Sequence, residues 1–186
     1  MNKHLSEWFS GFFISAFAYA TLFYLNGWLT QYLVYDLGVS WIYLPAGLRL
    51  FLTLIFGFPG ALGIGCATFL LAYYGDFSQN AITCIGVGLI SGFAPYIARF
   101  FILTNIRIAP DLSDLNLPKL VICIVIYALL SAGLHQYWFA TRGLDHAGTV
   151  NDFLVMFVGD VFGTVLLVAA IKYGLDGIRQ FKKTMP

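Results

Sequence analysis

Long apolar stretches alternate with short polar or turn-forming segments along this chain of 186 residues. The apolar runs cover residues 8–34, 41–58, 61–74, 81–103, 120–140 and 153–173. A helix needs about 20 apolar residues to cross the hydrocarbon core of a bilayer, and most of these runs reach or approach that length. The pattern therefore predicts an all-α, polytopic transmembrane helical bundle of about six spans.

The third run is short for a span, and a turn signal precedes it. Gly57, Pro59 and Gly60 stand between the second and third runs, and proline and glycine interrupt helices. We therefore expect the second and third runs to be neighbouring helices that form a tight hairpin.

Composition agrees with a membrane location. Hydrophobic residues make up 60% of the chain and charged residues 10%, whereas soluble domains carry about 25% charged residues. The mean hydropathy is +0.82. We expect residues 1–186 to form a single integral membrane domain that contacts the lipid bilayer. The net charge of +1 gives no reason to expect nucleic acid as a partner.

The basic residues orient the predicted bundle. In a six-span arrangement, one side of the membrane carries Lys3, Arg99, Arg107, Lys119, Lys172, Arg179, Lys182 and Lys183. The opposite loops carry Arg142 and several aspartates. Because cytoplasmic loops are enriched in lysine and arginine, both termini are expected in the cytoplasm.

Arg49 and Asp160 lie inside the second and sixth runs, with apolar residues on both sides. A charge at the centre of a bilayer costs at least about 2.5–3.5 kcal/mol, so such residues usually face the protein interior and have partners. The two residues lie at similar depth if their runs enter from the same side. We therefore expect a polar intramembrane centre in which Arg49 and Asp160 meet, directly or through a water. Backbone carbonyls, a ligand or snorkelling remain alternatives for Arg49, and proton or cation binding for Asp160.

Motifs for catalysis, cofactors or metals are not apparent in the sequence. His135, His146, Asp145 and Asp152 fall near the predicted outer side, but their spacing matches no metal-ligand pattern. His135 is better explained as part of an interfacial aromatic belt, and Asp152 as a cap of the sixth helix. We expect no metal, no cofactor and no enzymatic activity.

The second and sixth runs resemble the MASE-type family of bacterial membrane-associated sensor domains. The shared pattern is a tryptophan and a Pro-x-Gly that open a span, and a later Gly-Asp-x-x-Gly. The matching residues are Trp41, Pro45, Gly47, Gly159 and Gly163, with Arg49 and Asp160 beside them. The chain departs from the family by having a single proline after the tryptophan, fewer than about eight spans and no output domain.

What the resemblance implies is a sensory or signal-accessory module of a bacterial inner membrane. Without an output domain of its own, it would act on a separate membrane or cytoplasmic signalling protein. The alternative is a small-solute transport component, such as the substrate-binding membrane subunit of an importer. In that case the pairs Gly63/Ala67 and Gly88/Gly92 are candidate contacts with other subunits.

Overall fold

A computed structural model describes residues 3–75, 77, 80–109, 112–144 and 148–184. The described residues form six α-helices. These are α1 (Lys3–Leu29), α2 (Leu44–Phe56), α3 (Phe58–Tyr74), α4 (Ala81–Phe101), α5 (Leu117–Arg142) and α6 (Val150–Thr184). A short 3-10 helix, η1 (Gln31–Leu33), and the strands β1 (Val34–Asp36) and β2 (Val39–Ser40) lie between α1 and α2. A π-helical turn, η2 (Ile102–Ile106), extends α4.

Four helices in the described residues are long and apolar enough to cross a membrane. They cover His4–Leu29, Ala81–Ile106, Leu117–Arg142 and Val150–Gln180. Helices α2 and α3 are also apolar but have 13 and 17 residues. The structure thus confirms an all-α protein whose longest helices suit a bilayer.

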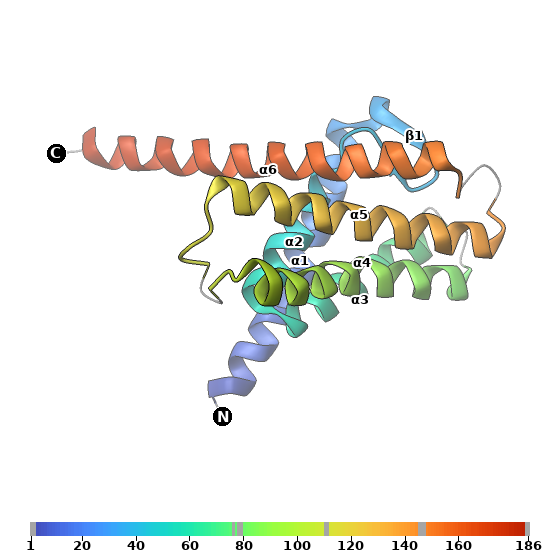
Figure 1. Ribbon diagram of the computed structural model, residues 1–186, viewed down its shortest axis with the longest axis horizontal. Coiled ribbons are helices and arrows are strands. Elements are labelled where there is room, and N and C mark those ends of the chain that lie inside the picture. Colours follow the sequence, from blue (N-terminus) through green and yellow to red (C-terminus); the bar gives the residue numbers. More distant parts are fainter. Residues whose placement is uncertain (1–2, 76, 78–79, 110–111, 145–147, 185–186) are drawn as a thin grey trace.

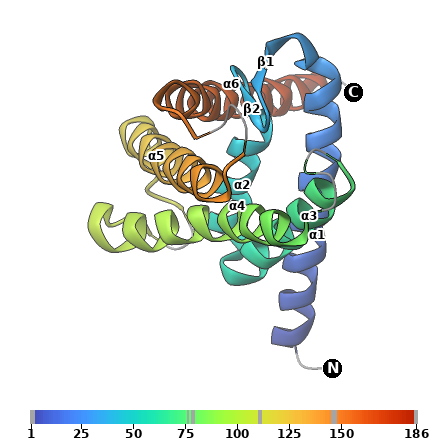
Figure 2. The same ribbon diagram turned by 90° about the vertical axis from the view of Figure 1, so that its right-hand side faces the viewer.

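The helices are layered rather than arranged in parallel. Helices α5 and α6 lie side by side, and α1 runs across their direction in Figure 1, while Figure 2 shows α1 at one edge of the protein, away from α5. Many large apolar side chains of α1 point away from the protein, including Phe17 and Trp28, each 71% exposed. A patch of this kind is unfavourable in water, so its exposure is consistent with lipid around the helix.

Small residues bring α1, α3 and α4 into close contact. A Cβ atom on Gly63 would lie 2.2 Å from the carbonyl oxygen of Phe12, and one on Gly92 would lie 2.3 Å from that of Ala61. Gly88 would likewise approach the carbonyl oxygen of Gly65 at 2.8 Å. These glycines therefore allow close helix packing within the chain, and whether they also contact another subunit stays a prediction.

The break between the second and third runs falls at a single residue. Gly57 has φ +61° and ψ −131°, a conformation that side chains with a Cβ atom rarely adopt. Pro59 then lies in the first turn of α3, where proline is tolerated. A Cβ on Gly60 would lie 2.8 Å from the carbonyl oxygen of Leu52. Helices α2 and α3 are thus in contact beside their turn, as the hairpin prediction requires.

The segment between the first two runs differs from the prediction. Helix α1 ends at Leu29, and residues 34–40 form an antiparallel β-hairpin in place of helix and loop. Gly38 has φ +70°, which allows the tight turn. Val39 is 1% exposed and packs with Val155 and Met156 of α6. The hairpin is therefore seated on the bundle.

Candidate functional site

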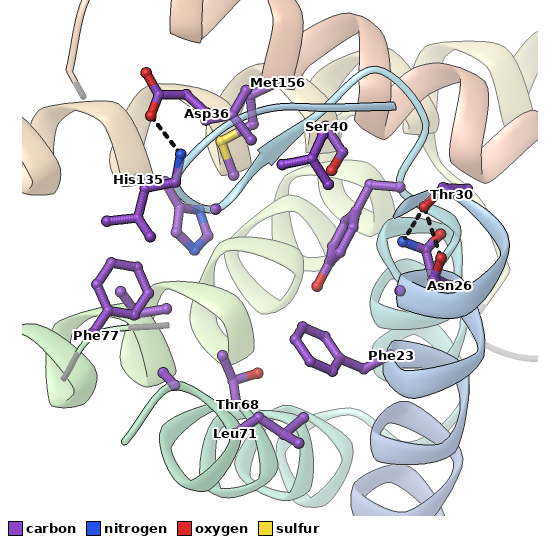
Figure 3. Close-up of a pocket in the computed structure, with 18 of the residues that line it drawn as sticks. Phe23, Asn26, Thr30, Asp36, Ser40, Thr68, Leu71, Phe77, His135 and Met156 are labelled. Atoms are coloured by element: carbon purple, nitrogen blue, oxygen red, sulfur yellow. Dashed lines mark hydrogen bonds between the residues drawn. The ribbon is translucent and has the colours of Figure 1, made fainter. Parts of the chain in front are cut away.

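A cavity of about 450 Å³ opens among the helix ends at the hairpin end of the bundle. Its wall includes the end of α1, the hairpin, the start of α2, the end of α3 and parts of α4, α5 and α6. Figure 3 shows Phe23, Asn26, Thr68, Leu71 and His135 around this space. Much of the wall is aromatic or aliphatic, with a few polar groups among them. Small-molecule sites in proteins generally have this size and character.

Arg49 contributes a buried positive charge to the wall of the cavity. It lies in the second turn of α2 and is 4% exposed. Its Nη2 donates hydrogen bonds to the hydroxyl oxygens of Tyr19, at 2.5 Å, and Tyr43, at 3.1 Å. The guanidinium carbon lies 5.0 Å and 5.1 Å from the centroids of the same two rings. Arg49 is therefore held between two tyrosines by hydrogen bonds and cation–π contacts.

The hydrogen-bonding capacity of Arg49 is not exhausted by these contacts. A guanidinium group has five N–H donors in a planar fork. Nε and Nη1 of Arg49 are buried and make no hydrogen bond within the described residues. Arg49 thus retains two donor atoms in the planar arrangement that matches a carboxylate or phosphate, and both atoms are buried beside the cavity.

Asp160 is also inside the bundle, at 1% exposure. The prediction was that Arg49 and Asp160 meet directly or through a water. No salt bridge joins them among the described residues, and neither carboxylate oxygen of Asp160 accepts a hydrogen bond there. Contact through a water stays a prediction. The two residues are near enough to interact electrostatically. Tyr19 and Tyr43 accept hydrogen bonds from Nη2 of the guanidinium, whereas Nε and Nη1 have no acceptor among the described residues.

The segment before α2 and residues 159–163 of α6 pack directly against each other. A Cβ on Gly159 would lie 2.0 Å from the carbonyl oxygen of Ser40, and one on Gly163 would lie 2.0 Å from that of Tyr43. The amide of Tyr43 donates to the carbonyl oxygen of Gly159 at 3.1 Å. Glycine on α6 therefore lets the backbone before α2 lie against the helix.

The remaining motif residues contribute to the same contact or to the start of α2. Gly47 faces α6, since a Cβ there would lie 2.9 Å from the Cα of Thr164. Pro45 is buried in the first turn of α2, and Trp41 is 45% exposed. The side-chain oxygen of Asn26 on α1 accepts a hydrogen bond from the amide of Leu44 at 2.9 Å. Helix α2 is thus fixed to α1 and α6 at its first turn.

His135 is buried, which corrects its assignment to an interfacial belt. It is 2% exposed and lines the cavity. Its Nδ1 lies 2.8 Å from the carbonyl oxygen of Ser131, and its Nε2 lies 3.2 Å from the hydroxyl of Ser91. Because a carbonyl oxygen only accepts, Nδ1 carries the proton in this contact. The imidazole is therefore held in place by α4 and α5.

Only two of the four acidic and histidine residues near the predicted outer side, His135 and Asp152, lie in the described part of the chain. No group of metal-ligating side chains occurs among the described residues, and Asp145 and His146 lie outside them. Asp152 accepts hydrogen bonds from the amide and hydroxyl of Thr149, and its own amide donates back to that hydroxyl. Asp152 therefore caps α6, as predicted.

Sequence reasoning missed Tyr19 and most of the cavity wall. Tyr19 is one of many aromatic residues in the first run and has no local feature that distinguishes it. The charge of Arg49 was the available signal, because a buried guanidinium requires acceptors from neighbouring helices.

Comparison with known proteins gives no relative. No family model, no curated protein and no solved structure matches this chain. The functional argument therefore depends on the cavity and its surroundings.

Proposed function

We propose that this protein is a membrane-embedded sensory or signal-accessory module that binds a small molecule in the cavity beside Arg49. The observation that carries the proposal is the cavity of about 450 Å³ with a buried arginine in its wall. A chain that needed only a stable helical bundle would gain nothing from such a space, because interiors are otherwise close-packed.

Helix α6 offers a physical route from the cavity to a partner. It contacts the segment before α2 through Gly159 and Gly163, and α2 carries Arg49. The whole helix has 35 residues and ends at Thr184. Its second half extends away from the other helices (Figure 1). A ligand that moves α2 would therefore also move α6. In this proposal, α6 transmits the change to a separate membrane or cytoplasmic signalling protein.

The proposed setting is a bacterial inner membrane with both termini in the cytoplasm. Support comes from the lysine and arginine bias of the loops and from the resemblance to MASE-type domains. With α2 and α3 counted as two short spans, the chain crosses about six times. The cavity then opens on the non-cytoplasmic side, because it lies at the end of the bundle where α1 ends and α6 begins.

The second candidate function is the substrate-binding membrane subunit of an importer. It is favoured by an apolar groove of about 400 Å³ between α3 and α4, whose wall includes Gly65, Phe69 and Leu89. Such a groove could receive a helix of another subunit. The two functions differ in outcome, because an importer subunit supports net uptake of solute when it is expressed with an ATPase. A sensory module instead changes the output of a kinase or cyclase without uptake.

A thiol-labelling experiment in intact cells tests whether the cavity is open to outside water. Cys66, Cys84 and Cys123 are first replaced by alanine, and Ala72→Cys then places one thiol in the cavity wall. We expect a membrane-impermeant methanethiosulfonate reagent to label this thiol in intact cells. The matched control is Thr104→Cys in η2, which should react only after permeabilisation. An unreactive Ala72→Cys, or one that reacts only from inside, would refute the proposed function.

A further inference from the structure

We propose that the ligand of the cavity is a small organic anion whose carboxylate binds Arg49 and whose apolar body fills the rest of the space. This inference rests on the proposed function, because it names the chemical class of the molecule that the same cavity takes. It goes further by assigning the recognising atoms and the orientation of the ligand.

The first support is the set of unused hydrogen-bond donors at Arg49. Nε and both protons of Nη1 have no acceptor among the described residues, although Arg49 is only 4% exposed. Buried polar groups normally have partners, and leaving charged donors unmatched is unfavourable. Nε and Nη1 have almost no surface toward the cavity, so a carboxylate there accepts from both, in the bidentate arrangement that arginine forms with such groups, once the guanidinium turns toward it.

The second support is a further polar group on the cavity wall that lacks a partner. Thr68 of α3 is 5% exposed and lines the same cavity as Arg49. Its Oγ1 makes no hydrogen bond within the described part of the chain. A hydroxyl can donate to an oxygen of the ligand. Arg49 on α2 and Thr68 on α3 thus line one space, and each has a buried donor without a partner among the described residues.

The other charged group on the wall determines how the anion would lie. Asp36, in the hairpin, accepts a hydrogen bond from the amide of Leu37 at 2.6 Å. Its negative charge repels an anionic group at the hairpin, and Arg49 is the only lysine or arginine among the described lining residues. The carboxylate therefore points toward Arg49. The apolar body lies among Phe23, Phe139 and Met156.

Asp160 is the group that would compete with the ligand for Arg49. It interacts with Arg49 electrostatically but does not line the cavity and forms no ion pair with it. Replacement of Asp160 by asparagine removes this competing charge while keeping a similar shape. Anion binding should therefore become tighter in Asp160→Asn.

The test compares reaction rates at Ala72→Cys for an anionic and a cationic methanethiosulfonate reagent, each relative to a free thiol in solution. We expect the anionic reagent to be favoured by about tenfold, because a buried charge biases the local concentration of small ions. Arg49→Gln should abolish this preference. Arg99→Gln is the matched control, because Arg99 lies on α4, outside the cavity wall, and donates to the carbonyl oxygen of Leu54.

A second arm uses protection of the same thiol by sodium benzoate and by neutral benzamide. Benzoate should slow the reaction of the Ala72→Cys thiol with the methanethiosulfonate reagent, and benzamide should not. This comparison needs no substitution at Arg49. Arg49→Gln should raise the half-protecting benzoate concentration by about 10- to 100-fold, as expected for loss of charge-assisted hydrogen bonds. Palmitate is tested in the same way, because a fatty acid from the bilayer presents the same carboxylate as an anion from water. Comparison of palmitate with benzoate therefore distinguishes the two sources of the ligand.

The outcomes distinguish this inference from the proposed function. A thiol that reacts from outside without anionic preference, and that benzamide protects as well as benzoate, would overturn the anion assignment and leave the cavity intact. A thiol that does not react from outside would overturn both. Protection by either acid, but not by its amide, supports a carboxylate at Arg49 and identifies the source of the ligand.

Discussion

Arg49 shows how a buried charge is accommodated in this bundle. The guanidinium is bound by two tyrosine hydroxyls, which also lie 2.9 Å from each other. Hydroxyl groups satisfy hydrogen-bond donors without adding a second charge. This arrangement leaves Asp160 as a separate buried carboxylate within electrostatic reach. The polar centre is therefore distributed over several side chains.

The first prediction concerns removal of one charge at a time. Arg49→Leu and Asp160→Leu should each destabilise the fold by about 3–5 kcal/mol, because each leaves the other charge buried without compensation. The double variant should be less destabilised than the sum of the two single variants. Thermal unfolding in detergent measures all three. Additive losses would show that the two charges do not interact.

At the scale of the helices, contact between α2 and α6 depends on glycine. Gly159 and Gly163 face backbone carbonyl oxygens at distances that exclude a methyl group. These glycines lie on either side of Asp160, so the same short segment provides both a packing surface and a buried charge. Helix α6 is thus one of the elements that hold α2, and with it Arg49, in place.

The second prediction compares two glycines of α6. Gly163→Ala should destabilise the protein by about 1–3 kcal/mol, because overpacking forces the backbone to shift. Gly177→Ala is the matched control, since a Cβ there meets nothing within 4 Å. It should be neutral or stabilising by up to about 1 kcal/mol through helix propensity. Equal melting temperatures for the two variants would contradict the packing described for Gly163.

The helices could be predicted from the sequence more readily than the site. Long apolar runs and the Gly57 to Gly60 turn indicated the helices and their main break, because these are local signals. The β-hairpin was missed, since residues 34–40 are few and flanked by apolar runs. The partners of Arg49 could not be derived, because Tyr19 is 30 residues away in sequence. Only the packing of α1 against α2 brings them together.

For the whole molecule, orientation in the membrane decides which solutes can reach the cavity. The cavity and the hairpin share one end of the bundle. The other end carries η2, the loop before α5 and the basic end of α6. From the positive-inside rule we propose that the end with η2 and the basic part of α6 faces the cytoplasm. The cavity would then sample solutes outside the cell membrane.

The third prediction concerns this orientation. Reporter fusions after Tyr74 and after Leu144 should read as non-cytoplasmic, and a fusion after Asp114 should read as cytoplasmic. The physical reason is the bias of lysine and arginine toward one side. A paired phosphatase and fluorescent-protein reporter at each position provides an internal control. Reversal at any of the three positions would disprove the proposed topology.

The most direct measurement is a crystal structure of the protein grown with 4-iodobenzoate, because the anomalous signal of iodine locates the ligand. We predict an iodine peak in the cavity near Phe23 and Phe139, with the carboxylate directed inward at the guanidinium of Arg49. Iodine in the apolar groove between α3 and α4, or a carboxylate directed away from Arg49, would contradict the assignment of this cavity as an anion site.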